Sequence, residues 1–458
     1  MNENPAGPAV PRKRWIDAVL VYRQPRMLSM LALGYSAGLP FYLVFQTLSA
    51  WLRQDGIQRS TIGMLAWVGL TYTLKFLWAP IVDRMALPLL TSALGRRRSW
   101  MLLAQAGIFV GLLNLSWSDP TASVVRIAAW AVFTAFFAAT QDIAVDAWRI
   151  ESAPVEQQGA MAAAYQVGYR LALITGGALA LALADTQGWQ LSYTVMAALV
   201  SVGVVTTLLT PEPGALARQA DVLREARVVD WLEEKAHWPD SLRAAGSWFI
   251  GAVICPLTDF FSRYGLLLAG LILLFMGSYR LTDFTMGSMT NSFYIDKGYT
   301  LTEVAAVVKA YGLAASVIGV ILAGLVMTKI GLLRSLVLGS AMVILSNVGF
   351  SLLAGSASKS LLGLGLVNGF DNLALAMHGT ALIAFLSSLT SVRYTATQYA
   401  LFSSMYALPG KVMEGFSGFV VDAIGYPRFF LYTASLSIPA LVLLWFLSRR
   451  GVVQRPEA

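Results

Sequence analysis

The chain has 458 residues, of which 57% are hydrophobic and only 13% are charged, about half the charged share of an ordinary soluble domain. Because one membrane span takes about 20 apolar residues, this composition predicts an all-α polytopic membrane protein and leaves no room for a large soluble domain. The single cysteine, Cys255, excludes an intrachain disulfide, and the two histidines fit no recognised zinc spacing, so we expect no metal site.

Apolar stretches bounded by charge, proline and glycine predict twelve spans in two sets of six. The first set covers 27–51, 60–82, 99–118, 121–148, 158–184 and 188–210, and the second covers 264–288, 301–327, 335–355, 360–388, 396–423 and 426–448. We therefore expect an N-terminal segment (1–26), a first six-helix bundle (27–210), a linker (211–263), a second bundle (264–448) and a tail (449–458).

The distribution of positive charge predicts the orientation. With both termini inside, 22 of the 33 Lys and Arg residues fall in cytoplasmic segments and six fall outside, as the positive-inside rule requires. The linker carries six basic against eight acidic residues, which indicates a solvated connector and no nucleic-acid partner. The apolar stretch from Ser247 to Phe261 is short for a span and contains Asp259, so we expect it to lie as an amphipathic helix at the membrane interface.

The two halves repeat at an offset of 237 residues. Asp185, Gly188 and Trp189 at one predicted turn correspond to Asp422, Gly425 and Tyr426 at the other. Two six-span halves joined by a long cytoplasmic linker resemble the major facilitator superfamily, whose substrate site lies between the halves at mid-membrane.

The loop between the second and third spans carries the superfamily's cytoplasmic signature in an interrupted form. A carboxylate at a helix end can pair with a basic loop residue and latch the halves in one state. The alternative is that the basic residues only enforce topology. The residues concerned are Asp83, Arg84, Gly95, Arg96, Arg97 and Arg98.

The fourth span ends in a polar face formed by Asp142, Asp146 and Arg149, at positions i, i+4 and i+7. Carboxylates within a span are costly, so they pair, line water or carry protons. We expect Asp146 and Arg149 to form a structural pair or to take part in gating. Asp142 lies one turn deeper and is the better candidate for proton coupling.

The fifth span supplies Tyr165, Gln166, Tyr169 and Arg170, a set that suits a polar sugar or peptide. The planar guanidinium of Arg170 matches a substrate carboxylate, although it equally matches a structural partner such as Asp142. The sequence leaves both interpretations open.

In the second half, polar groups recur inside the predicted spans. Arg280 and Asp283 lie three residues apart, Asp371 and Asn372 lie in the tenth span, and His378 follows on the same face. A lone histidine in an apolar helix is more often a satisfied core residue than a proton carrier.

Two lysines complete the intramembrane set. Lys309 follows a capping box of the eighth span and either extends toward the surface or faces the cavity. Lys411 follows Pro409 and Gly410 and has Glu414 one turn further on, so a local ion pair is the default.

These residues resemble those of the muropeptide permease (AmpG) family. The segments that carry the resemblance are 36–40, 75–80 with Asp83 and Arg84, 95–98, 139–146, Lys309 and 396–401. The resemblance implies a proton-driven inner-membrane importer of anhydromuropeptides that serves cell-wall recycling and β-lactamase induction. It also implies a monomer in contact with membrane lipids, with a proton gradient and no cofactor.

The expected substrate, an amino sugar joined to anhydromuramic acid and a short peptide, is polar and acidic, so basic and amide side chains are its natural ligands. We expect proton coupling at Asp142, Asp283 and Asp371, and gating at Asp83, Arg84, Gly95, Arg96, Arg97, Asp146 and Arg149. We expect substrate binding by Gln141, Tyr165, Gln166, Tyr169, Arg170, Arg280, Lys309, Asn372, Gln398 and Lys411.

Three alternative functions remain. The chain could transport another acidic substrate, such as an acetyl-CoA-like molecule, or exchange drugs for protons, although the candidate cavity cations argue against the latter. An integral-membrane transferase also needs intramembrane charge, but the sequence has no nucleophile elbow or metal triad. We therefore expect that the protein is not an enzyme.

Overall fold

The computed structural model describes residues 21–57, 66–154, 157–214, 233–235, 237, 239–304, 307, 311–450 and 452, and the regular structure of these residues is helical throughout. The first half comprises η1 (Val21–Arg23), α2 (Pro25–Tyr42), η2 (Leu43–Thr47), α3 (Leu48–Gln54), η3 (Ala66–Gly69), α5 (Leu70–Thr73), η4 (Lys75–Leu77), α6 (Ala79–Arg84), α7 (Leu90–Leu94), α8 (Arg96–Ser116), α9 (Val124–Ser152), α10 (Gln158–Ile174), η6 (Thr175–Leu179), α11 (Ala180–Gln187), α12 (Trp189–Leu199) and α13 (Ser201–Leu209). The rest comprises α16 (Asp240–Phe249), η7 (Ile250–Ile254), α17 (Cys255–Tyr279), α18 (Leu281–Asp296), α19 (Leu301–Val304), α20 (Gly312–Ile330), α21 (Leu332–Gly355), α22 (Leu361–Leu389), α23 (Thr395–Ser435) and α24 (Ser437–Arg449).

Ten helices in the described ranges are long and apolar enough to cross a membrane. The segment expected to be the second span is instead broken into short pieces, from η3 to α6. Pro80 stands at the start of α6, where its missing N–H costs nothing and a new helix can begin. The all-helical fold class is confirmed, whereas the count of twelve spans and their orientation stay predictions.

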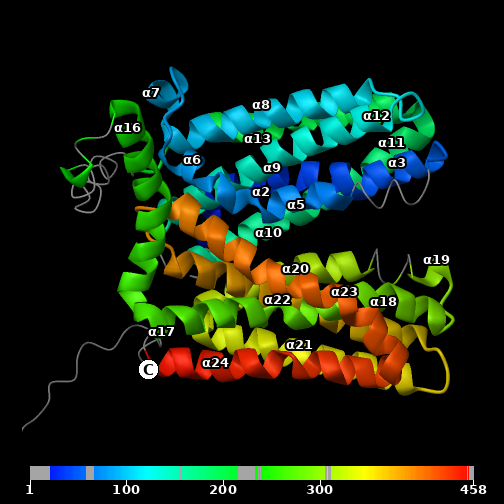
Figure 1. Ribbon diagram of the computed structural model, residues 1–458. Coiled ribbons are helices and arrows are strands. Elements are labelled where there is room, and N and C mark those ends of the chain that lie inside the picture. The colour runs from blue at the N-terminus through cyan, green and yellow to red at the C-terminus, as the bar shows by residue number, and fades with distance from the viewer. Residues whose placement is uncertain are drawn as a thin grey trace, which may run out of the picture.

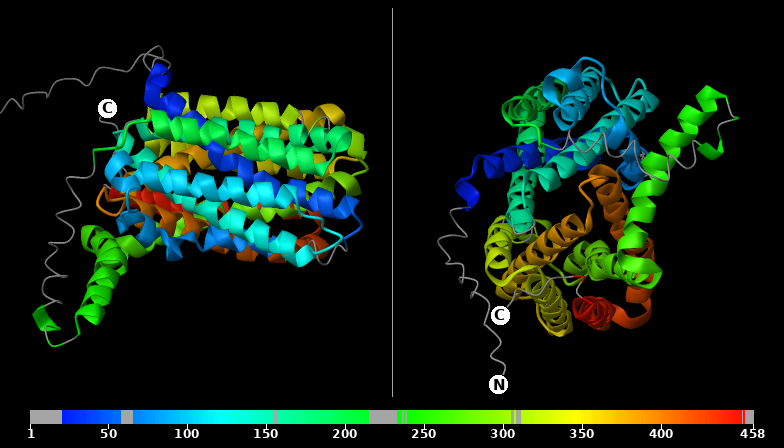
Figure 2. Two further views of the ribbon diagram at one scale, coloured as in Figure 1. Left: turned by 90° about the horizontal axis from the view of Figure 1, so that it is seen from above. Right: turned by 90° about the vertical axis from the view of Figure 1, so that its left-hand side faces the viewer.

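The two halves lie side by side (Figures 1 and 2). Between them, α10 contacts α20 and α22, while α6 and α9 contact α23. Their ribbons lie close together at the end that carries α16 and apart at the end that carries α3 and α19 (Figure 1). We call the first of these the linker end; α2 begins and α24 ends there (Figure 2).

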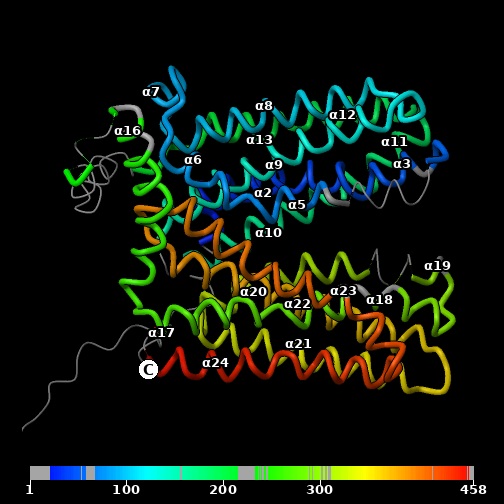
Figure 3. Tube along the Cα trace, viewed as in Figure 1, coloured from blue at the N-terminus to red at the C-terminus, as the bar shows by residue number. Residues whose placement is uncertain are grey.

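The last part of the linker, from residue 240 onward, is helical and lies across the linker end of the molecule before the chain joins the second bundle. α16, η7 and the start of α17 run at a steep angle to the spans, and the chain then turns to run along the bundle (Figure 3). The turn is at Gly265, whose φ of 72° and ψ of 161° fall where a side chain is strained.

The predicted duplication is visible in the backbone. Gly188 and Gly425, matched at an offset of 237 residues, have φ of 86° and 74° and the same ψ of 162°. Gly95 and Gly331, which precede α8 and α21 and lie 236 residues apart, have similar φ of 85° and 81°. The two halves therefore use the same left-handed junctions between successive helices.

Close packing of α2 against α10 positions the polar face of α10. A Cβ on Gly34 would collide with the backbone of Tyr165, and one on Gly168 would collide with the backbone of Leu31. The two helices can approach this closely only because both positions lack a side chain. This contact fixes the helix that carries Tyr165, Tyr169 and Arg170.

Candidate functional site between the two halves

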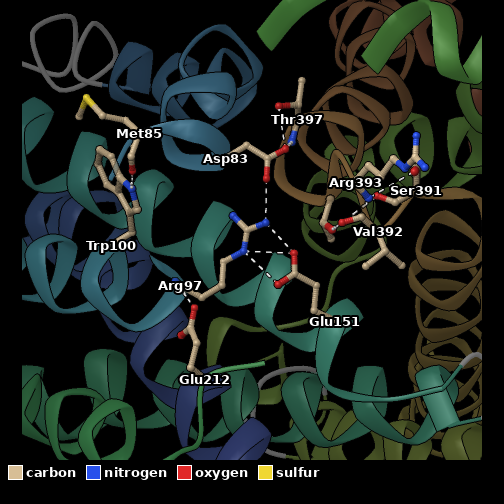
Figure 4. A network of polar contacts seen from close by, with 11 residues as sticks. Asp83, Met85, Arg97, Trp100, Glu151, Glu212, Ser391, Val392, Arg393 and Thr397 are labelled. Atoms are coloured by element: carbon tan, nitrogen blue, oxygen red, sulfur yellow. Dashed lines mark hydrogen bonds and ion pairs between the residues drawn. The ribbon is translucent and has the colours of Figure 1, made fainter. Parts of the chain in front are cut away.

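A buried ionic network closes the linker end (Figure 4). The Arg97 guanidinium donates to Asp83 at 2.7 Å and to Glu151 at 2.6 Å. Asp83 Oδ2 then accepts hydrogen bonds from the backbone N–H and the hydroxyl of Thr397, at 3.2 and 3.1 Å. Since Thr397 lies in the first turn of α23, the first-half carboxylate sits at the positive end of a second-half helix.

The surroundings of Asp83, at the end of α6, favour its charged form. Burial acts to raise the pKa of Asp83, but the guanidiniums of Arg97 and Arg96 hold it below its ordinary value. Arg97 is itself anchored, because Glu212 accepts hydrogen bonds from the backbone N–H groups of Arg97 and Arg98. The sequence analysis did not identify Glu151, Glu212 or Thr397 as part of this site.

Arg149 makes a second connection between the halves. Its guanidinium pairs with Asp146 on its own helix at 3.3 Å and donates to Ser387 of α22 at 2.8 Å. It also lies over the ring of Tyr399, 5.0 Å from the centroid. Lys75 adds an ion pair to Asp146 at 3.7 Å. The predicted Asp146–Arg149 pair therefore exists and also ties the two halves together.

The start of α17, in the last part of the linker, is hydrogen-bonded to the same first turn of α23 that binds Asp83. The Gln398 amide donates to the Pro256 carbonyl at 2.8 Å and to Asp259 at 2.9 Å, and its oxygen accepts from Arg263 and from the Ser391 N–H. Gln398 is buried and fully hydrogen-bonded. Its polar atoms are used at the linker end in this conformation, and its assignment to substrate binding stays a prediction.

Arg84 lies beside this helix from the first half. A Cβ on Gly251 would collide with its guanidinium, and the guanidinium lies 5.7 Å from the centre of the Tyr394 ring. Arg84, of the predicted gating set, thus contacts both η7 and the turn that leads into α23.

In the first half, Asp142 lies among tyrosines. Tyr72, Tyr165 and Tyr169 are close enough for its charge to act on their hydroxyl groups, and Lys75 acts on Asp142 in turn. The Oδ1 oxygen of Asp142 is buried and has no hydrogen-bond partner among the residues that the structure describes. Such an oxygen is available to a proton or a ligand.

Arg170 lies on α10, the helix that also carries Tyr165 and Tyr169. Within the described part of the chain it forms no ion pair, so the alternative of an Asp142–Arg170 pair does not hold in this conformation, and its Nε is buried without a hydrogen-bond partner. Arg280 of the second half is near enough for the two positive charges to interact. Two guanidiniums, one from each half, are thus close enough for their charges to interact, and both can stabilise a nearby anion.

On the second half, Arg280 donates to Asp283 at 2.8 Å, and the same carboxylate oxygen lies 3.2 Å from Nδ1 of His378. Asp371 is buried and accepts a hydrogen bond from Ser346 at 2.7 Å. Asn372 donates within its own helix to Asn368. Asp283 and Asp371, both predicted for proton coupling, therefore lie in buried polar surroundings.

The three remaining predicted binding residues are Gln141, Lys411 and Lys309. Gln141 is completely buried and accepts a hydrogen bond from Ser36 within the first half, while its amide nitrogen has no hydrogen-bond partner among the described residues, so its assignment to substrate binding stays a prediction. Lys411 is exposed and pairs with Glu414 at 3.4 Å, as a local ion pair. Lys309 lies outside the described residues.

Aromatic residues that the sequence analysis did not single out border the site. Phe41 contacts the rings of Tyr72 and Tyr169, with centroids 5.4 and 6.2 Å apart, and Phe45 lies 4.8 Å from Phe41. In the second half, Tyr406 lies 5.9 Å from the Arg280 guanidinium. Flat apolar faces next to hydroxyls and guanidiniums suit a sugar-containing anion.

Comparison with known proteins identifies the family. The sequence profile of the Major Facilitator Superfamily matches residues 27–413. The anhydromuropeptide permease of Escherichia coli K12 is 36% identical over 427 residues, which cover 93% of this chain and 80% of that protein. The chain belongs to the muropeptide permease family. A second member of this family, the Rickettsia felis transporter designated AmpG 4, is 32% identical over 94% of this chain and 98% of its own length.

The muropeptide permease family is a family of multi-pass membrane transporters and not of enzymes, in agreement with the expectations from sequence. The proton:xylose symporter XylE has the same fold, with a TM-score of 0.62 over 95% of each chain at 12% identity. At that identity the likeness shows the fold alone.

Proposed function

We propose that this protein imports anhydromuropeptides, GlcNAc-1,6-anhydroMurNAc and its peptides, from the periplasm to the cytoplasm across the inner membrane, driven by the proton gradient. The observation that carries the proposal is the buried Arg170, whose Nε has no hydrogen-bond partner among the described residues and whose charge interacts with that of Arg280 in the other half, in a chain 36% identical to the E. coli anhydromuropeptide permease. The protein acts as a monomer without a cofactor and moves the substrate by alternating access.

The chemistry of the site matches this ligand. The peptide carboxylates suit the two arginines, each of which offers a fork of donors. The sugar rings suit the aromatic surface of Phe41, Tyr165 and Tyr169, and we assign the hydroxyl and N-acetyl groups of the sugars to the amides of Gln166 and Asn372.

Proton coupling is proposed at Asp142, with Asp283 and Asp371 next in line. The support for Asp142 is its unpartnered buried oxygen among tyrosines. A carboxylate in such surroundings can take a proton on one side of the membrane and release it on the other.

The contacts at the linker end support loading from the periplasm. Asp83–Thr397 and Arg149–Ser387 join the halves at that end, and the distribution of Lys and Arg favours a cytoplasmic location for it. On this proposal, the conformation described here accepts substrate from the periplasm. Thiol labelling in a Cys255→Ala background checks the orientation: a cysteine replacing Ala220 should be protected from an impermeant external reagent, and one replacing Ser358 should react.

Counterflow in proteoliposomes tests the substrate without any proton gradient. Vesicles loaded with unlabelled anhydromuropeptide should transiently accumulate the labelled compound, and vesicles loaded with acetyl-CoA or buffer should not. Exchange with acetyl-CoA but not with anhydromuropeptide would show that the two arginines serve another acidic substrate and would refute the proposal.

A further inference from the structure

His378 occupies an unusual position for a buried histidine. Its side chain is completely buried in α22, yet only one ring nitrogen has a partner: Nδ1 lies 3.2 Å from Asp283 Oδ2, while Nε2 is buried without a hydrogen-bond partner in the described part of the chain. The ring lies against that of Tyr279, with centroids 3.9 Å apart. A structural histidine is normally hydrogen-bonded at both nitrogens, so the open nitrogen calls for an explanation.

Asp283 is shared between two basic groups. Its Oδ2 oxygen accepts from Arg280 Nε at 2.8 Å and faces His378 Nδ1, whereas its Oδ1 is buried without a hydrogen-bond partner among the described residues. With a neutral imidazole, Arg280 and Asp283 cancel, so the cluster has no net charge. With an imidazolium, the cluster carries one positive charge and two cations compete for one carboxylate.

Arg280 connects this cluster to the space between the halves. Its side chain is 28% exposed, compared with 5% for Asp283 and none for His378. Its charge is near enough to interact with that of Arg170 in the first half. The group that would meet a substrate carboxylate is therefore the outermost member of a buried chain that ends at His378.

In the part of the chain that the structure describes, the neighbours of His378 named below on α17, α21 and α10 are neutral groups. Tyr279 donates its hydroxyl to the Leu336 carbonyl. On α21, Ser340 adjoins Gly339, whose Cβ would lie 2.9 Å from the His378 backbone. On α10, Gln166 Nε2 lies 4.0 Å from the position of a Cβ on Gly379. The remaining charge is Asp371 on α22, which acts on Asp283 and is bound to Ser346.

We propose that His378 is a positioning residue that links protonation to substrate capture: the imidazolium takes over Asp283 and frees the Arg280 guanidinium to bind a substrate carboxylate opposite Arg170. Loss of the proton returns Asp283 to Arg280 and releases the anion. The inference rests on the proposed function, since it requires an acidic substrate, and it adds a second titrating group to Asp142.

The linkage has a definite sign. If binding takes up one proton, the dissociation constant rises by at most about tenfold for each pH unit over which the histidine of the free protein is neutral. Affinity should therefore fall as the pH is raised from 5.5 to 8.5.

Calorimetry on the purified full-length protein tests the inference. Binding of anhydromuropeptide is measured at pH 5.5, 6.5, 7.5 and 8.5 in two buffers of different ionisation enthalpy, which gives both affinity and proton uptake. Wild type should bind more weakly as the pH rises and take up protons at pH 7.5. His378→Gln, which keeps a hydrogen-bonding amide but cannot be charged, should bind weakly at every pH without the proton uptake.

A second variant keeps the test decisive if His378→Gln does not fold. Asp283→Asn removes the competitor for Arg280, so it should bind at pH 8.5 about as tightly as wild type does at pH 5.5, with a flat profile. Wild-type binding without proton uptake, or an unchanged pH profile in either variant, would overturn the inference. No binding by wild type at any pH would instead refute the proposed function and the inference with it.

Discussion

Asp83 and Thr397 are 314 residues apart in sequence and belong to different halves, yet the carboxylate of one accepts both the backbone N–H and the hydroxyl of the other. The same carboxylate is held by Arg97, which Glu151 holds in turn. A rocking motion that opens the linker end must break the Asp83–Thr397 contact, whereas the Asp83–Arg97 pair stays within one half. This contact therefore stabilises closure together with Arg149–Ser387.

Asp83→Asn should shift the protein toward a conformation open at the linker end. Asn keeps the size but loses the charge that binds Arg97 and the start of α23. A loss of about 2 kcal/mol, within the range for charged hydrogen bonds, shifts the equilibrium by roughly 30-fold. Spin labels on cysteines replacing Ser92 and Arg393, in a Cys255→Ala background, should report a longer distance. Asp119→Asn, an exposed loop carboxylate, is the matched control and should leave the distance unchanged.

The gate should not respond to pH in the physiological range. Because the pKa of Asp83 is lowered in the closed state, its stabilising effect is fully present above the ordinary aspartate value of about 3.9 and is lost only as the pH falls through the lowered value. The same spin-label distances should be seen at pH 5.5 and 8. A change over this range that Asp83→Asn abolishes would contradict this assignment of charge.

Substitution of two glutamines, Gln398 and Gln166, distinguishes a role in the linker-end network from a role in substrate binding. Gln398→Ala removes several buried hydrogen bonds, each worth about 1 kcal/mol, so it should lower the unfolding temperature by several degrees with little change in affinity for anhydromuropeptide. Gln166→Ala should leave the unfolding temperature close to that of wild type and weaken binding by roughly 2- to 12-fold, the effect of one neutral hydrogen bond. The reverse pattern would return Gln398 to the binding site.

Arg170→Lys tests whether the guanidinium binds a peptide carboxylate. Lysine keeps the charge but loses the fork, so affinity should fall by about 1 to 3 kcal/mol, or roughly 5- to 150-fold. The same muropeptide with amidated peptide carboxylates should bind wild type and variant alike. An equal loss for both ligands would show that Arg170 contacts the sugar or supports the fold.

Much of the fold was predictable because hydrophobic stretches, turn glycines and charge placement are local properties of the sequence. The spacing of Asp142, Asp146 and Arg149 identified one polar face, and Arg280 with Asp283 identified another. Partners distant in sequence could not be predicted. The sequence does not show that Gln398 contacts Pro256 and Asp259, or that Gln141 accepts a hydrogen bond from Ser36. Thr397 lies in a segment that carries the family resemblance, but its contact with Asp83 depends on where α6 ends.

Uphill transport tests the central claim most directly. Proteoliposomes containing the protein and an alkaline interior should accumulate labelled anhydromuropeptide above its external concentration, and a protonophore should abolish that accumulation. Asp142→Asn should lose uphill accumulation while it retains counterflow, since Asn keeps the size of the side chain but cannot be ionised. Accumulation that is unaffected by collapse of the proton gradient, or that is normal in Asp142→Asn, would contradict proton coupling through this site.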